Sequence, residues 1–253
     1  MRILISNDDG INADGINILR ESLEKLEIIK EIYVAAPDRE RSAVGHGITM
    51  HRPLRVKEIK YPSGKSLGWA VDGTPADCVK LAVEELIPNP PDLVVSGINQ
   101  GSNLGTDVLY SGTVSAAVEG VVNGFPSVAL SLTSFRDHDF THAADFSARL
   151  VAMALKEFLE PGTLINVNIP PGVPRGVRVT RLGYRRYINI FDKRTDPRGR
   201  DYYWMAGEPL ELDENSPDTD VSACREGYIA ITPIKIDLTS YREIEKLKKW
   251  DFI

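Results

Sequence analysis

Cysteine and long apolar runs are scarce in this chain of 253 residues. Its two cysteines, Cys78 and Cys224, are far apart in the sequence and form no metal-type spacing. No apolar run approaches the roughly 18 residues of a membrane-spanning helix, and the amino terminus has no signal-peptide pattern. We therefore expect a cytoplasmic protein with both thiols free and no membrane partner.

An excess of basic charge is also missing. The net charge is −6, which argues against nucleic acid as the main partner. Two phosphate-binding fingerprints are absent as well. No Gly-Lys-Ser/Thr follows the glycine-rich segment at residues 96–113, which excludes a P-loop. No Gly-x-Gly-x-x-Gly follows the first expected strand, which excludes a dinucleotide fingerprint.

An acidic pair stands at the end of the first expected strand. Residues 2–6 form a short apolar run that is typical of a buried parallel strand, and Asn7-Asp8-Asp9-Gly10 follows it. Ligands bind at the carboxyl ends of strands in open α/β sheets, and oxygen donors favour a hard ion, Mg²⁺ or Mn²⁺. The same four residues are also common in turns and at helix N-caps. This stretch alone therefore leaves both a metal site and a plain turn open.

Expected strands and helices alternate as far as residue 169. A helix over 13–26 and a strand over 31–36 complete a β-α-β unit, which predicts a parallel sheet. The pattern as a whole predicts a doubly wound α/β layer. The remaining expected strands cover residues 92–96, 127–132 and 163–169, extended segments cover 48–59 and 66–72, and helices cover 75–86, 114–123 and 140–159.

Two polar loops are expected on the same sheet edge as the acidic pair. The loop at 37–47 carries Ser42, a possible metal or phosphate ligand, although a loop this polar is also compatible with a plain solvated surface. The loop at 96–113 begins near Asn99, a neutral oxygen ligand. It ends at Gly112 and Thr113, whose backbone N–H groups at a helix start suit a phosphate.

Two further features are ambiguous. His138 and His142 have a spacing compatible with metal binding, but no carboxylate or thiol partner stands out, so we expect them to face solvent. After residue 176 the chain becomes rich in arginine and aromatic residues between 184 and 204, which suits a contact between subunits or, less well, a nucleotide or single strand. An acidic loop over 208–220, a strand over 227–233 and a closing amphipathic helix over 240–250 are expected to follow.

Taken together, these motifs resemble the survival protein SurE family, and the resemblance covers essentially the whole chain. One such motif would be weak, whereas all of them in this order and spacing are specific. The segments that carry it are Asn7-Asp8-Asp9-Gly10, residues 36–42, Gly73-Thr74-Pro75 before Asp77-Cys78, residues 96–99, Asn103-Leu104-Gly105, Tyr110-Ser111-Gly112-Thr113 and Ile231-Thr232-Pro233.

The resemblance implies a fold, an activity and a metal site. The fold would be a Rossmann-like α/β catalytic core over 1–182, with a β-hairpin and helix extension over 183–253 (oligomerisation arm, last strand and helix) exchanged between subunits of a homodimer or homotetramer. The activity would be that of a divalent-metal-dependent phosphomonoesterase, acting on nucleoside 5′-monophosphates and on polyphosphate. One Mg²⁺ or Mn²⁺ per subunit would be held by residues that match Asp8, Asp9, Ser42 and Asn99.

The expected mechanism relies on positioning and charge neutralisation. A metal on the four ligands would leave room for water and a phosphate oxygen, and Asp8 or Asp9 would act as general base. The other phosphate oxygens would be held by Asn103, Ser111, Gly112 and Thr113. Three alternatives stay open: an aspartyl-phosphate intermediate on Asp8 or Asp9, a receiver-like signalling module, and a nucleic-acid-binding module.

Overall fold

A computed structural model describes residues 1–136, 138–157, 159–205, 207–213 and 216–252. Strands and helices alternate through its first 169 residues, as the sequence predicts. These elements are β1 (Arg2–Ser6), α1 (Asp14–Glu24), β2 (Glu31–Pro37), β3 (Val56–Lys60), β4 (Ser66–Val71), α2 (Pro75–Leu81), the π-helix η1 (Ala82–Leu86), β5 (Leu93–Gln100), the 3₁₀-helix η2 (Gly105–Leu109), α3 (Gly112–Val122), β6 (Ser127–Leu132), α4 (Thr141–Ala154) and β7 (Thr163–Ile169).

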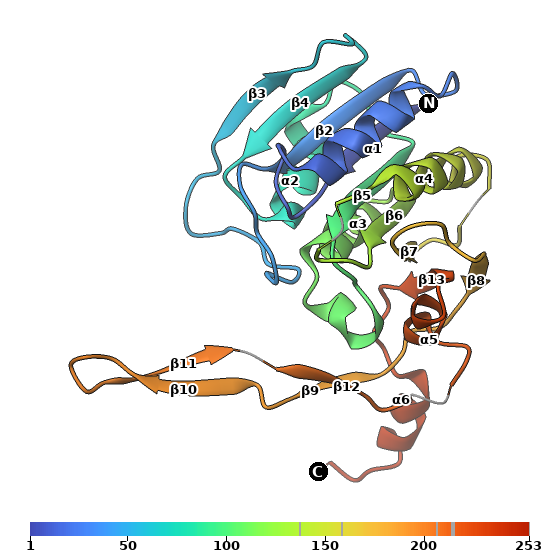
Figure 1. The fold of residues 1–253 in the computed structure, drawn as a ribbon. Helices are drawn as coiled ribbons and strands as arrows, with labels where there is room; N and C mark the ends of the chain where they lie inside the picture. The colour runs from blue at the N-terminus through green and yellow to red at the C-terminus, as the bar shows by residue number, and fades with distance from the viewer. Residues whose placement is uncertain (137, 158, 206, 214–215, 253) are drawn as a thin grey trace.

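The rest of the chain adds a strand pair to the sheet, two hairpin ladders and two helices. The ladder strands pair antiparallel, β9 with β12 and β10 with β11, and we call residues 185–211 the arm. The arm projects away from the core (Figure 1). These elements are β8 (Val177–Val179), β9 (Arg185–Ile188), β10 (Phe191–Thr195), β11 (Asp201–Met205), β12 (Glu208–Glu211), α5 (Asp220–Arg225), β13 (Ile229–Lys235) and α6 (Tyr241–Leu247).

The central sheet has the strand order β3-β4-β2-β1-β5-β6-β7-β13-β8 (Figure 1). From β4 to β7 neighbouring strands are parallel, whereas β3 and β13 run antiparallel to β4 and β7. The expected mostly parallel α/β sheet is therefore confirmed. The chain runs from β1 towards β2 on one side and reaches β5 on the other, so the topological switch point lies between β1 and β5.

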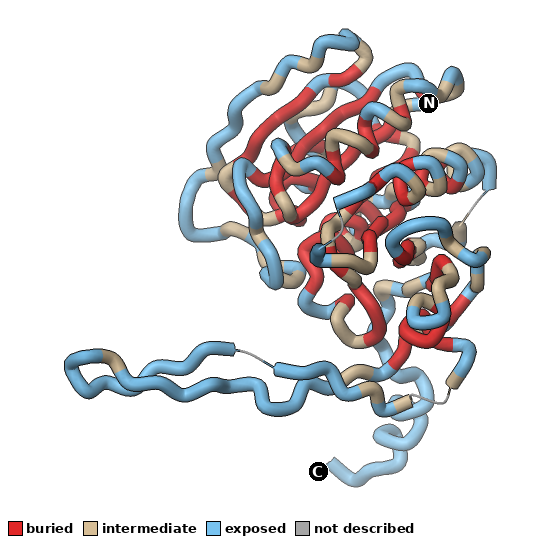
Figure 2. The backbone as a smooth tube through the Cα atoms, in the orientation of Figure 1, coloured by how far each residue is buried: buried red, intermediate tan, exposed pale blue. Residues whose placement is uncertain are grey.

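Helices cover both faces of the sheet, and β1 contributes side chains to each. Ile3 and Ile5 pack with α1 and α4 in one apolar cluster, whereas Leu4 packs with α2 and α3 in another. This alternation follows from the period of two along a strand. Figure 2 shows that burial is concentrated in these layers and that the arm is exposed over most of its length.

Several expected elements differ from those observed. The expected extended segment 48–59 forms a strand only from Val56. Before Val56, backbone N–H groups bond to side chains instead of a neighbouring strand: Asp77 Oδ1 accepts the N–H of Thr49 at 2.9 Å, and Asp72 Oδ1 accepts that of Arg55 at 2.8 Å. Strand β5 extends to Gln100, beyond the expected end at residue 96. Helix α4 ends at Ala154, whereas the sequence predicts residue 159, and residue 158 lies outside the described residues.

The acidic segment after residue 208 is also more ordered than expected. It begins with β12, which pairs with β9, and α5 starts at Asp220 with Thr219 as its N-cap. Residues 214–215 lie outside the described part. The expected closing helix 240–250 is α6, and each of its residues is exposed. Its apolar face is therefore uncovered in a single chain.

The division at residues 182 and 183 stays a prediction, and the extension is not separate in space from the core. Strand β13 pairs with β7 and β8 inside the central sheet, and α5 packs beside it with Val221 and Ala223 buried. Both cysteines are free, as expected. Among the described helices, none combines the length and apolarity needed to cross a lipid bilayer.

Candidate active site

The acidic pair lies at the switch point, on a turn that the sequence builds locally. The side chain of Asn7 accepts the N–H of Gly10 at 3.2 Å and donates to its carbonyl at 2.9 Å, which closes the turn around Asp8 and Asp9. Gly10 has φ +101°, and a Cβ there would lie 3.1 Å from the backbone of Arg39. Glycine is therefore required for the loop after β2 to pass this close.

Asp8 is almost completely buried against the start of α3. The hydroxyl of Thr113 donates a short hydrogen bond to Asp8 Oδ1. A Cβ on Gly112 would lie only 2.7 Å from Cβ of Asp8, so the helix start fits directly against the carboxylate. Burial raises the pKa of Asp8, and the bond from Thr113 only partly opposes this rise.

Asp9 is less buried and faces the end of β5. The N–H of Gln100 donates to its Oδ2 at 3.2 Å. Burial, and then the neighbouring charge of Asp8, raise the pKa of Asp9 to about 6. Burial and mutual repulsion thus disfavour the charged forms of two adjacent carboxylates, which is an environment typical of functional sites.

The structure places both remaining expected ligands on neighbouring segments. The N–H of Arg41 donates to the carbonyl of Asp8 at 2.8 Å, which puts the following residue, Ser42, beside the acidic turn. Asn99 lies near the end of β5, after a shift in its register with β6. Its amide nitrogen donates to Gly101 O at 2.9 Å, so its amide oxygen is the atom free to serve as a ligand.

Three of the four expected phosphate-binding residues, Ser111, Gly112 and Thr113, lie at the start of α3. Ser111 is the N-cap, and its hydroxyl accepts the N–H of Val114 at 3.0 Å. The N–H groups of Gly112 and Thr113 belong to the first turn, where a helix presents unpaired donors and a positive dipole end. Asn103 has another contact, because its amide nitrogen donates to Ser131 Oγ at 2.8 Å.

A cavity of about 330 Å³ opens beside Asp9. It is a feature that the sequence did not predict, because its wall comes from four distant segments. His138 is exposed, as expected, and it also lies on this wall, where its Nε2 atom is 3.2 Å from Nε2 of Gln100. The lining residues are Asp9, Asn12, Ala13, Asp14, Gly15, Glu40, Gln100, His138 and Phe140.

Histidine and cysteine do not complete a metal site here. Among the described residues, no group of three or more His, Cys, Asp or Glu side chains is placed to hold a metal ion. The candidate ligand set consists of two carboxylates, one hydroxyl and one amide, so only Asp8 and Asp9 belong to these four residue types. A metal at this edge would therefore depend on Ser42 and Asn99 as well as on the acidic pair.

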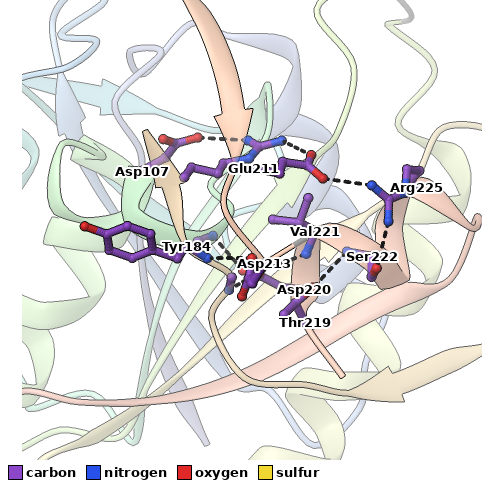
Figure 3. Close-up of polar contacts among 12 residues, drawn as sticks. Asp107, Tyr184, Glu211, Asp213, Thr219, Asp220, Val221, Ser222 and Arg225 are labelled. Carbon is purple, nitrogen blue, oxygen red and sulfur yellow. Dashed lines mark hydrogen bonds and ion pairs between the residues drawn. The ribbon is translucent and has the colours of Figure 1, made fainter. Parts of the chain in front are cut away.

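The two ends of the arm, Arg185 and Glu211, form what we call the arm root, and they hold the loop before α3 from outside. Arg185 Nη1 lies 3.0 Å from Asp107 Oδ2 in η2, and Glu211 bridges Arg185 at 3.5 Å to Arg225 at 2.8 Å (Figure 3). Both side chains of the Arg185–Asp107 pair are largely buried. The loop that leads to the helix start is thus attached to the extension as well as to the sheet.

A second attachment runs through Asp220, which is completely buried. Its carboxylate accepts the N–H groups of Gly105 and Gly183, each at 2.8 Å. Burial raises the pKa of Asp220, while these backbone donors oppose the rise. Figure 3 shows Asp220 at the start of α5, close to the arm root.

Comparisons with known proteins agree on one family. The family model described as "Survival protein SurE" matches residues 3–189. A protein named 5′-nucleotidase SurE from Pelotomaculum thermopropionicum is 65% identical over 252 residues, covering 98% of this chain and 95% of that protein. Another of the same name, from Desulforudis audaxviator, is 58% identical, covering 99% and 97%. The crystal structure of the SurE protein from Aquifex aeolicus superposes with a TM-score of 0.84 at 39% identity, covering 98% of each chain.

Proposed function

Because the chain belongs to the survival protein SurE family, we propose that it is a divalent-metal-dependent 5′-nucleotidase that hydrolyses nucleoside 5′-monophosphates to nucleoside and phosphate. The observation that carries this proposal is the charge pair of Asp8 and Asp9, set against the first turn of α3 at one sheet edge. The names of the relatives support the substrate class. The family resemblance supports a further activity on polyphosphate.

The donor set suits one Mg²⁺ or Mn²⁺ per subunit. Asp8, Asp9, Ser42 and Asn99 all offer oxygen, which hard cations prefer. Burial disfavours the charged form of both carboxylates and raises their pKa values, and a bound cation would favour that charged form. When bound, the ion would neutralise charge on the phosphate and polarise the phosphoryl group.

The protein groups would hold the substrate and accept a proton. The N–H groups of Gly112 and Thr113 would donate to phosphate oxygens, helped by the helix dipole. Asp9 is the better general base of the two acids, because Thr113 already occupies Oδ1 of the more deeply buried Asp8. Asp9 Oδ1 would take a proton from the attacking water, since Oδ2 accepts the N–H of Gln100.

We also propose a homodimer or homotetramer formed through the extension 183–253. Large apolar side chains are exposed on the arm, including Phe191 at 62%, Trp204 at 60% and Met205 at 76%. Exposed apolar surface of this kind is typical of a contact between subunits. Nucleic acid is a weaker candidate for the same surface, because acidic residues of the β10–β11 hairpin pair with its Lys193, Arg194 and Arg200.

Metal add-back tests the proposed activity. The protein is stripped with chelator, and phosphate release is followed from nucleoside 5′-monophosphates, polyphosphate and a phenyl phosphate ester, with Mg²⁺ or Mn²⁺ restored. We expect release only with metal, and a loss of at least about a hundredfold in Asp9→Asn. Asp145→Asn, which removes an exposed carboxylate on α4, is the matched control and should behave as wild type. Release that survives chelation, or full activity of Asp9→Asn, would refute the proposal.

A further inference from the structure

Glu119 is a buried carboxylate that the proposed reaction does not use. It lies on α3, and its side chain is 2% exposed. Three donors surround it: His46 Nε2 lies 2.8 Å from its Oε2, while Asn123 Nδ2 and Lys80 Nζ lie 2.9 and 3.4 Å from its Oε1. The contact with His46 is the main cause that lowers the pKa of Glu119, so the carboxylate is charged and the imidazole donates to it.

His46 belongs to the loop that carries Ser42, and it reaches α3 far from the helix start. Glu119 is seven residues along the helix from Gly112, a distance of about 10 Å at 1.5 Å per residue. His46 contacts α3 at Glu119 and not at the first turn, so an influence of the imidazole on the reaction would pass through the loop.

Backbone hydrogen bonds fix this loop on both sides of Ser42. On one side the N–H of Arg41 donates to the carbonyl of Asp8 at 2.8 Å. On the other side the N–H of Gly45 donates to the carbonyl of Tyr110 at 3.0 Å. The hydrogen bond between the next residue, His46, and Glu119 adds a side-chain contact to this second attachment.

The Ser42 hydroxyl lies on the loop segment between these two attachments. Ser42 is exposed, and its hydroxyl donates to Glu40 of the same loop at 2.6 Å. The next residue, Ala43, has φ +55°, a left-handed conformation that favours glycine. An alanine holds this conformation only when the flanking attachments impose it.

We propose that His46 and Glu119 form a positioning pair that holds Ser42 at the metal site. This inference rests on the proposed function, in which Ser42 is a metal ligand. Without the pair, the loop keeps its backbone attachments at Arg41 and Gly45 and the hydrogen bond from Thr74 Oγ1 to the carbonyl of Gly47, but it loses the side-chain contact between His46 and α3. Glu119 itself keeps Lys80 and Asn123 as donors, so the fold survives the loss of His46.

A double-mutant cycle between His46 and Ser42 tests the proposal. Mn²⁺ affinity is measured by calorimetry on wild type, His46→Ala, Ser42→Ala and the double variant. We expect each single variant to weaken Mn²⁺ binding about tenfold. Because both act through the same hydroxyl, the His46→Ala change should cost less than about twofold in the Ser42→Ala background. Additive losses, or unchanged affinity in His46→Ala, would overturn the proposal.

Matched variants separate positioning from loss of fold. His46→Gln keeps a donor for Glu119 and should recover most of the Mn²⁺ affinity. His51→Ala removes an exposed histidine a few residues further on and should bind Mn²⁺ as wild type does. Melting temperatures in chelator should agree among these variants. If His46→Ala melts at a lower temperature than wild type, the Mn²⁺ affinity of His46→Gln is compared with that of Glu119→Gln instead. Equal Mn²⁺ affinity in those two variants would overturn the proposal.

The outcome also distinguishes this inference from the proposed function. If wild-type protein binds no Mn²⁺ and releases no phosphate, the proposed function fails. If wild type does both while the cycle is additive, only the positioning role of His46 fails. A split in kinetics gives a second readout: half-saturating metal concentration should rise in His46→Ala, whereas turnover at saturating Mn²⁺ should stay near wild type.

Discussion

At the scale of single residues, the acidic pair lowers the stability of the metal-free protein at neutral pH. Asp9 has a pKa of about 6 and Asp8 a pKa that burial raises. The folded metal-free protein therefore holds protons that the unfolded chain releases near pH 4. Its free energy of unfolding should fall as pH rises from about 4 through 6, since stability is lost through the raised pKa of the folded state.

This gives a stability prediction for Asp9→Asn. Removing the charge should stabilise the metal-free protein at pH 8 by about 1–2 kcal/mol, with partial exposure taken into account, or about 4 °C in melting temperature. Saturating Mn²⁺ should stabilise wild type and not the variant. Thermal melts at pH 4.5 and pH 8, with and without chelator, check this. A variant that melts below wild type at pH 8 in chelator would contradict it.

The hydroxyl of Thr113 gives a second residue-scale prediction. Thr113→Val keeps the shape but removes the donor to Asp8 Oδ1, which should raise the pKa of Asp8 further. Turnover should fall about 10- to 100-fold, and the acidic limb of the pH–rate profile should shift to higher pH. Thr113→Ser keeps the donor and should stay within a few-fold of wild type. Equal profiles for the two variants would count against this role of Thr113.

At the scale of elements, the sequence predicted those whose signal is local. The apolar run 2–6 and the capping residues Thr74 and Pro75 determine β1 and the start of α2 from neighbouring residues alone, and both are observed. Strand β12 was missed because it depends on pairing with β9 some twenty residues earlier. The His46–Glu119 contact joins residues 73 positions apart, so no local pattern reveals it.

The candidate site divides in the same way. Asp8, Asp9 and Asn99 were expected at strand ends, and β1 and β5 are indeed neighbours. The hydrogen bond from Gln100 to Asp9 and the cavity wall at His138 come from the packing of separate segments. The metal-ligand and phosphate-binding roles themselves stay predictions.

The arm root supplies a prediction at the scale of elements. Arg185→Met should remove a largely buried ion pair with Asp107 and lower stability by about 2–3 kcal/mol. Arg194→Met, near the arm tip, breaks an exposed pair with Asp192 and should cost less than about 1 kcal/mol. Denaturant unfolding of the two variants checks the contrast. Equal losses would show that the attachment of the arm root to η2 is not specific.

At the scale of the whole molecule, exposed apolar surface is concentrated on the arm and α6. Figure 2 shows both as exposed, whereas burial is concentrated in the inner strands of the central sheet and in the helices that cover it. Phe191 and Trp204 lie on the β10–β11 hairpin with over half of their surface accessible. Such side chains are costly to leave in water, which is why we expect a second chain to cover them.

Sedimentation experiments test this expectation. The pair of changes Phe191→Ser and Trp204→Ser should raise the dissociation constant of the assembly at least about tenfold, because buried aromatic anchors dominate many interfaces. Met153→Ser, which changes an exposed apolar residue on α4, is the control and should leave assembly unchanged. A monomeric wild-type protein, or an unaffected double variant, would refute the arm as the contact surface.

The most direct test of the central claim is an anomalous diffraction measurement on crystals soaked with Mn²⁺ and inorganic phosphate. We predict one manganese peak per subunit, within bonding distance of oxygen atoms of Asp8, Asp9, Ser42 and Asn99. The phosphate should lie between that peak and the first turn of α3, on the N–H groups of Gly112 and Thr113. A manganese peak elsewhere, or none at Asp8 and Asp9 in well-ordered crystals, would contradict the assignment of this sheet edge as a metal-dependent phosphatase centre.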